Sequence, residues 1–257
     1  MNRLQSELHR LYLSKPQAHG ANTTPPSALI DAQRDTVRAL VMELTRPPSW
    51  KLLSKVWHGV QAELELPAPA IAVSGTDGLQ LWFSLAEPIS APQAHAFLES
   101  LRVRFLPDTD ARRVRLMPAA DASALQPQRH ARLVPALQEP TGNWSAFVAA
   151  DLAPVFEETP WLDIPPSEEG QATLLRGLDT TKPAVFEEAL KRLVPITANI
   201  DVRVTHPQPV TAAADEDPKR FLLRIMNDDS VALALRIEAA KALLQHSNEH
   251  RPRQQVD

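Results

Sequence analysis

The spacing of apolar residues switches between two periods along residues 37–117, and this switching constrains the fold more than any other feature of the sequence. Residues 37–44 form an apolar run typical of a mostly buried strand, which ends before Pro47 and Pro48. Ser49 is expected to cap the helix that follows. That helix has apolar residues at helical spacing, namely Leu52, Leu53, Val56, Val60 and Leu64. The first unit is therefore a strand followed by a helix.

A turn with two glycines joins the next two predicted strands. Residues 70–74 and 79–85 flank the turn 75–78, and glycine readily adopts the positive φ that a tight hairpin requires. Ser90 and Pro92 then start a second helix. Its apolar stripe consists of Ala94, Phe97, Leu98, Leu101 and Phe105.

Residues 112–118 predict one further strand. Val114 and Leu116 are expected on one face of it, and Arg113 and Arg115 on the other. The order of elements is then β-α-β-β-α-β, the split βαβ or ferredoxin-like motif, and the fold class is α+β.

The rest of the chain is less regular. Two short strands are expected within residues 132–149, and helices are expected within 160–178 and 183–194. The predicted division is an N-terminal helix and loop (1–36), an α+β domain (37–196), a linker (197–217), a helical hairpin (218–250) and a disordered tail (251–257).

Composition limits the classes of function. The 257 residues include no cysteine, which excludes disulfides, thiolate catalysis and thiolate metal sites. No apolar run reaches the length of a membrane span, and the N-terminus lacks the apolar core of a signal peptide, so we expect a cytoplasmic protein without a membrane partner. The histidines lack ligand spacing, so no metal site is predicted from them. With a net charge of −4, any contact to phosphate must come from a local patch.

The predicted hairpin contains a Ser-Gly motif followed by an aromatic residue, formed by Ser74, Gly75, Gly78 and Trp82. With the strand before it and the Arg-Leu segment after it, residues 41–148 resemble the catalytic core of the archaeo-eukaryotic primase superfamily, which is found on plasmids, phages and mobile elements. The resemblance implies a sheet like that of an RNA-recognition motif. It also implies metal-dependent nucleotidyl transfer at paired acids on the first strand, a hairpin His and a third acid.

The sequence departs from the family pattern at the residues that carry catalysis. Gln80 stands in the place of the His, and an amide cannot supply the charge of an imidazolium. Glu43 stands alone where the family has two acids, and Asp108 or Asp110 takes the place of the third. Two-metal chemistry needs several convergent oxygen ligands. The resemblance therefore implies a catalytically degenerate protein with vestigial Glu43, Asp108 and Asp110, and Mg²⁺ or Mn²⁺ is expected only if the site is active.

A local group of arginines is the strongest candidate for binding phosphate. It consists of Arg102, Arg104, Arg112, Arg113, Arg115, Arg129 and Arg132. Guanidinium groups suit bidentate phosphate contacts, so Arg113, Arg115 and Arg132 are expected to hold a nucleotide or a single strand beside the hairpin and Gln80. Trp82 and Phe83 are the only aromatic residues expected to stack with bases. The alternative is that the arginines pair with carboxylates of neighbouring helices.

Taken singly, the hairpin residues also have purely structural interpretations. Glu43 can be a strand-surface residue, Gln80 an outward-facing residue opposite it, and Asp77 the turn residue before Gly78.

The C-terminal region has a second resemblance. Its Asp-Pro, Phe-Leu-Leu, Met-Asn-Asp and Ala-Ala-Lys pattern is similar to a helical assembly segment of phage small terminase subunits. The resemblance implies self-association or partner docking through residues 218–246, although amphipathic helices after Asp-Pro also arise by convergence.

Three functions follow as hypotheses. The first is a degenerate primase-like protein that binds nucleic acid or nucleotide, as an accessory protein of a bacterial mobile element or phage remnant. The second is a protein-interaction module without a nucleic-acid role. The third is an active metal-dependent primase or nucleotidyltransferase with an altered site.

Overall fold

The computed structural model describes residues 2–13, 29–31, 34–123, 125–126 and 129–193. The chain divides into two compact units, Met1–Ala198 and Asn199–Asp257. The predicted linker, helical hairpin and tail, with the expected association through residues 218–246, lie outside the described residues. In the described part of the chain, no helix combines the length and the apolar character needed to cross a membrane.

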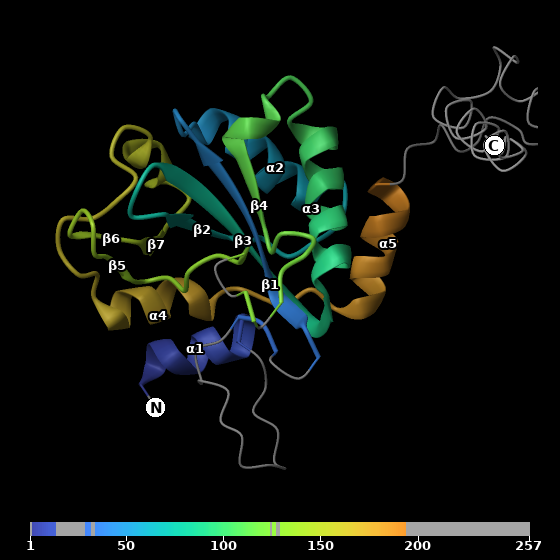
Figure 1. Cartoon of the computed structure of the whole chain (residues 1–257), viewed down its shortest axis with the longest axis horizontal. Helices are drawn as coiled ribbons and strands as arrows, with labels where there is room; N and C mark the ends of the chain where they lie inside the picture. The colour runs from blue at the N-terminus through green and yellow to red at the C-terminus, as the bar shows by residue number, and fades with distance from the viewer. Residues whose placement is uncertain (1, 14–28, 32–33, 124, 127–128, 194–257) are drawn as a thin grey trace, which may run out of the picture. The chain divides into compact units, whose positions relative to one another are not determined.

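The first unit is an α+β fold built on a five-stranded antiparallel sheet with the order β4-β1-β3-β2-β7 (Figure 1). The β-α-β-β-α-β order that periodicity predicts is observed. It consists of β1 (Thr36–Thr45), α2 (Trp50–Ala62), β2 (Ala70–Val73), β3 (Gly78–Ser90), α3 (Ala91–Phe105) and β4 (Val114–Met117). The two long strands, β1 and β3, pair at the centre of the sheet.

Further elements extend this core at both ends of the sequence. They are α1 (Arg3–Leu11), the 3₁₀ helix η1 (Ala111–Arg113), β5 (Leu137–Gln138), β6 (Asn143–Trp144), β7 (Ala146–Val148), the 3₁₀ helix η3 (Ala153–Phe156), α4 (Glu168–Arg176) and α5 (Pro183–Leu193). β5 and β6 form a separate two-stranded hairpin, as the turn residues predict, whereas β7 joins the edge of the main sheet beside β2.

One face of the sheet forms the larger core with α2, α3 and α5. Because successive side chains of a strand point to opposite faces, Leu40, Met42 and Leu44 of β1 all lie in this core. Phe97 of α3 contacts Phe83 of β3 edge to face and also packs on Phe186 of α5. Figure 1 shows α3 and α5 side by side on this face.

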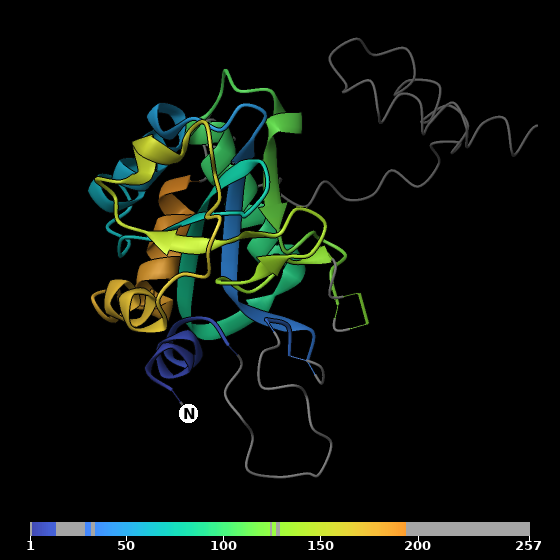
Figure 2. The ribbon, with the colours of Figure 1, turned by 90° about the vertical axis from the view of Figure 1, so that its left-hand side faces the viewer.

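The opposite face of the sheet is covered as well. Figure 2 shows α1 and α4 lying next to each other, and both contribute to a second apolar cluster under β1, β2, β3 and β7. Trp82 lies at its centre, fully buried, with ring centroids 5.3 Å from Tyr12 and 5.8 Å from Phe147. The expectation that Trp82 and Phe83 are available for stacking bases is therefore wrong, because both are buried in packed cores.

A buried guanidinium attaches α1 to the sheet. Arg38 of β1 donates from Nη2 to the carbonyl oxygen of Arg10 at 2.9 Å, and from Nη1 to that of Leu13 at 3.0 Å. Its Nε donates to the carbonyl oxygen of Leu85 in β3 at 2.9 Å. The last carbonyl groups of a helix lack partners within that helix. Arg38 thus satisfies the end of α1 and bonds it to the central strands.

Two local predictions need correction. Ser49 occupies the N-cap position of α2, but its side chain makes no capping hydrogen bond, and the Glu157 carboxylate accepts from the backbone N–H groups of Trp50 and Lys51 instead. Arg113 does not lie on a strand, because Asp110 caps η1 and β4 begins only at Val114.

Candidate functional site

A row of polar residues crosses three strands at one end of the sheet. In the strand register, Glu43 of β1 lies opposite Gln80 of β3 on one side and opposite Arg115 of β4 on the other. Along their strands, these three residues alternate with the apolar residues of the larger core, so their side chains point to the opposite face of the sheet. Further along the strands, α1 and α4 cover this opposite face. The sheet thus brings together two predicted binding residues and one predicted catalytic residue.

Glu43 is a buried carboxylate, and a glycine makes room for it. Only 4% of its side chain is exposed. A Cβ atom added to Gly78, which pairs with Thr45 in the register, would lie 2.7 Å from Cγ of Glu43 and 2.9 Å from its Cδ. Gly78 is therefore needed here for close approach, because any larger side chain would compete with the carboxylate for the same space.

Two arginines lie beside the turn residue Asp77, close to Glu43. Nη1 of Arg115 lies 3.7 Å from Oε2 of Glu43 and 3.7 Å from Oδ1 of Asp77. Nε of Arg46 donates to Oδ2 of Asp77 at 2.8 Å. Arg46 has a φ of 51°, in the left-handed region that non-glycine residues rarely adopt and that recurs at functional sites. The result is an alternating group of two guanidinium groups and two carboxylates, which we call the hairpin charge cluster (Arg46, Asp77, Arg115 and Glu43).

The two carboxylates of this cluster have opposite pKa shifts. Burial raises the pKa of Glu43 and outweighs the opposing effect of Arg115, while nearby Asp77 raises it further. Burial also acts to raise the pKa of Asp77, but the hydrogen bond from Arg46 and the charges of Arg115 and Arg46 bring it below its usual value. Asp77 is therefore the more persistent anion, and Glu43 the group that more readily takes up a proton.

Gln80 connects the cluster to the core behind it. Its Oε1 accepts from Nε1 of Trp82 at 2.8 Å, and its polar side chain favours the charged form of Glu43. Trp82 thus has a positioning role in the site, through Gln80, rather than the exposed role that the sequence suggests.

The turn itself is held by its own residues and by a neighbouring hairpin. Oγ of Ser74 accepts from the backbone N–H of Gly78 at 3.0 Å. Gly75 has a φ of 79°, and a Cβ atom there would lie 2.7 Å from Cγ of Gln138. Nη1 of the exposed Arg132 donates to Oε1 of Gln138 at 3.3 Å, which places Arg132 beside the same turn. The sequence motif therefore predicts the turn correctly.

The remaining predicted residues lie elsewhere or act otherwise. Arg113 donates to the backbone oxygens of Thr45 and Pro47, at 3.3 and 2.6 Å, so its guanidinium holds the end of β1. Asp108 is exposed in the turn after α3, and Asp110 caps η1 by accepting from the N–H of Arg112 at 2.9 Å. Among the described residues, no three or more His, Cys, Asp or Glu side chains are grouped to hold a metal ion.

Sequence reasoning missed two members of the cluster. The sequence suggests only a turn role for Asp77, and Arg46 lies outside the motif because it follows the predicted strand. The only sequence signal for Arg46 is its position between that strand and Pro47, which places it at the end of the sheet that carries the hairpin.

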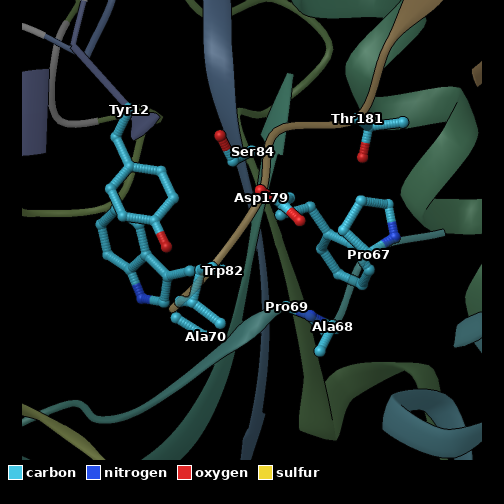
Figure 3. Close-up of a pocket in the computed structure, with 11 residues that line it drawn as sticks. Tyr12, Pro67, Ala68, Pro69, Ala70, Trp82, Ser84, Asp179 and Thr181 are labelled. Atoms are coloured by element: carbon cyan, nitrogen blue, oxygen red, sulfur yellow. The ribbon is translucent and has the colours of Figure 1, made fainter. Parts of the chain in front are cut away.

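A narrow pocket lies away from the cluster, beside Trp82. Figure 3 shows Tyr12 beside Trp82, with its hydroxyl directed into a narrow pocket bounded by Pro67, Ala70 and Thr181. The hydroxyl is buried and has no hydrogen-bond partner among the described residues, and burial raises the pKa of Tyr12 far above its usual value. The pocket has no room for a water molecule, so we assign it to packing.

No protein-family model matches the chain, and no match is found among curated proteins.

Proposed function

We propose that this chain is a primase-like protein that has lost the catalytic residues of that superfamily and binds a nucleotide or single-stranded nucleic acid at the hairpin charge cluster. The register of Glu43 opposite Gln80 carries the proposal. By the resemblance, these are the positions of the first-strand acid and the hairpin His, and the sheet places them side by side. A role in a bacterial mobile element or phage remnant rests on the resemblance alone.

Binding is supported by the exposure of the arginines. The side chains of Arg46 and Arg115 are 75% and 48% exposed, and Arg132 is exposed beside the turn. Each guanidinium group can therefore contact a ligand from solvent without any rearrangement of the core. Guanidinium groups bind phosphate through two parallel N–H donors, and this property does not require a metal ion. The hairpin supplies the rigid support that such contacts need.

Loss of catalysis is supported by the surroundings of Glu43. Its carboxylate is buried, lies beside Arg115, and has a pKa raised by burial, all of which disfavour its use as an open ligand for a divalent cation. Asp108 and Asp110 do not join it in a metal-binding group. A carboxylate that was once a metal ligand would in this arrangement serve to orient Arg115.

The covered sheet face limits where a ligand can lie. In a sheet that binds a single strand, aromatic side chains on the open face stack with bases. Here that face is packed under α1 and α4, and Trp82 is inside it. We therefore place the ligand at the sheet end, against the hairpin and the exposed arginines, where phosphate contacts dominate.

The test is a titration of the purified protein with fluorescent single-stranded DNA and with labelled nucleotide, with and without Mn²⁺, at two salt concentrations. We expect salt-sensitive binding that does not need Mn²⁺, since the contacts are ionic. Arg115→Ala should weaken it. Arg3→Ala removes an exposed arginine that pairs with Glu169 on α4, so it serves as a charge-matched control and should bind as the wild type does.

Three outcomes contradict the proposal in different ways. Absence of binding to both ligands at low salt would remove the nucleic-acid role and favour an interaction module. Equal loss in Arg115→Ala and Arg3→Ala would show general charge attraction rather than a site. Mn²⁺- or Mg²⁺-dependent nucleotide incorporation that disappears in Glu43→Ala would establish an active enzyme with an altered metal site.

A further inference from the structure

We infer that Asp77 is a specificity residue of the hairpin charge cluster: its carboxylate lies beside both arginines, where a bound phosphate would lie, and so favours anions of higher charge. The inference rests on the proposed function, because it concerns what the same arginines bind. It assigns to Asp77 a part in selecting the ligand, beyond its place in a turn.

The first step is the competition for donors. Asp77 accepts from Nε of Arg46 at 2.8 Å and lies 3.7 Å from Nη1 of Arg115. These guanidinium groups come from two different places in the chain, the residue after β1 and strand β4. A phosphate that lies between both guanidinium groups competes with the Asp77 carboxylate for the same space beside them, so binding requires this carboxylate to move or to share the arginines.

The second step is that only one of the two carboxylates can move. Glu43 is fixed, since 4% of its side chain is exposed and Gly78 packs against it. The side chain of Asp77 is 31% exposed, next to the exposed Thr76 in the turn. Asp77 can therefore turn toward solvent while Glu43 stays in place beside Arg115.

The third step is the charge balance. With Asp77 in place, the two guanidinium groups face two carboxylates. A phosphodiester has one negative charge, the same as the Asp77 carboxylate that it would replace beside the arginines. The exchange therefore brings no additional charge interaction. A phosphomonoester has a second pKa near 6 and approaches two negative charges at neutral pH. The monoester thus gains an interaction that the diester does not, and the site should favour terminal phosphates.

The experiment compares two probes that share a base and a sugar. Adenosine 5′-monophosphate has a terminal phosphate, and adenosine 3′,5′-cyclic monophosphate has a diester. Their affinities are measured by calorimetry at low salt and above pH 7. Competition with 5′-phosphorylated and with 5′-hydroxyl oligothymidylate then shows whether the site takes the terminal phosphate of a free nucleotide or that of a strand end. We expect the wild type to prefer the monoester about fivefold or more, the value of a good exposed ion pair.

The variant that tests the assignment is Asp77→Asn, which keeps the size and one oxygen acceptor of the side chain but removes its charge. It should bind the cyclic compound several-fold more tightly and reduce the preference for the monoester. The matched control is Asp121→Asn, which removes an exposed aspartate paired with Arg129 outside the cluster and should leave both affinities unchanged.

The results separate the two ideas. If neither the wild type nor Asp77→Asn binds any of the probes, the proposed function fails and this inference fails with it. If both proteins bind and the ratio of the two affinities is the same in each, the inference alone is refuted. Equal affinity of the wild type for the two adenosine compounds also refutes it, without reliance on a variant.

Discussion

Gly78→Ala tests whether Glu43 is held against the hairpin as the structure shows. The added Cβ would lie 2.7 Å from Cγ and 2.9 Å from Cδ of Glu43, well inside normal contact distance. Both carbons must move, and they have little room because the side chain is buried. Overpacking of this kind typically costs about 1–3 kcal/mol. We expect Gly78→Ala to lower the free energy of unfolding by that amount.

The magnitude should depend on Glu43 itself. In a Glu43→Ala background, Oε1, Cγ and Cδ are absent, so the three nearest contacts of the added methyl group are removed. The cost of Gly78→Ala should then fall below about 0.5 kcal/mol, because replacing glycine also lowers the entropy of the unfolded chain. Urea unfolding of the wild type, the two single variants and the double variant gives the coupling energy between the two positions.

Gly177→Ala is the control for that cycle. No atom lies within 4 Å of a Cβ at Gly177, so this substitution should have the same effect in both backgrounds. Additivity of Gly78→Ala and Glu43→Ala within about 0.5 kcal/mol would refute the reasoning. It would mean that the carboxylate does not occupy the space beside Gly78, and the hairpin charge cluster would lose its buried member.

Four further predictions concern charge and burial. Burial raises the pKa of Glu43 in the folded protein. The stability that this group contributes is therefore complete below the usual carboxyl pKa and is lost as pH rises through the folded value. In urea unfolding, Glu43→Gln should be more stable than the wild type at about pH 8 but not at about pH 3. Burial lowers the pKa of His130 from 6.5 to about 4, so the protein should lose stability as pH falls from about 6.5 to about 4. His130→Gln should not show this loss in urea unfolding. Arg38→Ala leaves buried carbonyl groups of α1 unpaired and should cost about 3 kcal/mol or more, with early proteolysis near α1; equal stability and protection would contradict this. Tyr12→Phe removes a buried hydroxyl that has no hydrogen-bond partner among the described residues, so it should raise stability by about 1 kcal/mol in thermal unfolding; a loss would show that the hydroxyl does have such a partner.

The predictable part of the fold is the part decided by neighbours in the sequence. β1 and β3 follow from apolar runs, and the start of α3 follows from Ser90, whose side chain accepts from the N–H of Gln93 in a capping box. The 75–78 turn follows from its glycines. Each of these signals acts within a few residues, so the sequence can express it directly.

The unpredicted part depends on contacts between distant segments. Trp82 is buried by Tyr12 and Phe147, which lie far from it in the sequence and reach it only through α1 and β7. Alternation alone places Trp82 on one face of β3 but cannot say whether that face is open. The helix cap at α2 shows the same limit, since the capping carboxylate of Glu157 comes from beyond η3.

The same reasoning explains why only part of the site could be predicted. The family pattern locates the hairpin and the strand acid, and the register then brings Glu43, Gln80 and Arg115 into one row. Asp77 and Arg46 have no counterpart in that pattern, and their meeting depends on the left-handed turn at Arg46. A sequence motif identifies residues by their order and spacing, whereas an ion pair between two loops appears only in three dimensions.

Covering the sheet changes what this fold can bind. An open sheet offers a strand a row of aromatic faces, whose affinity depends on stacking and tolerates many sequences. Here α1 and α4 occupy that surface, and Arg38 secures α1 to the two central strands. What stays exposed at the hairpin is charge rather than aromatic surface. If the proposed function holds, a ligand at the hairpin is recognised by its anionic groups, and the charge of the ligand rather than its base sequence should decide its affinity.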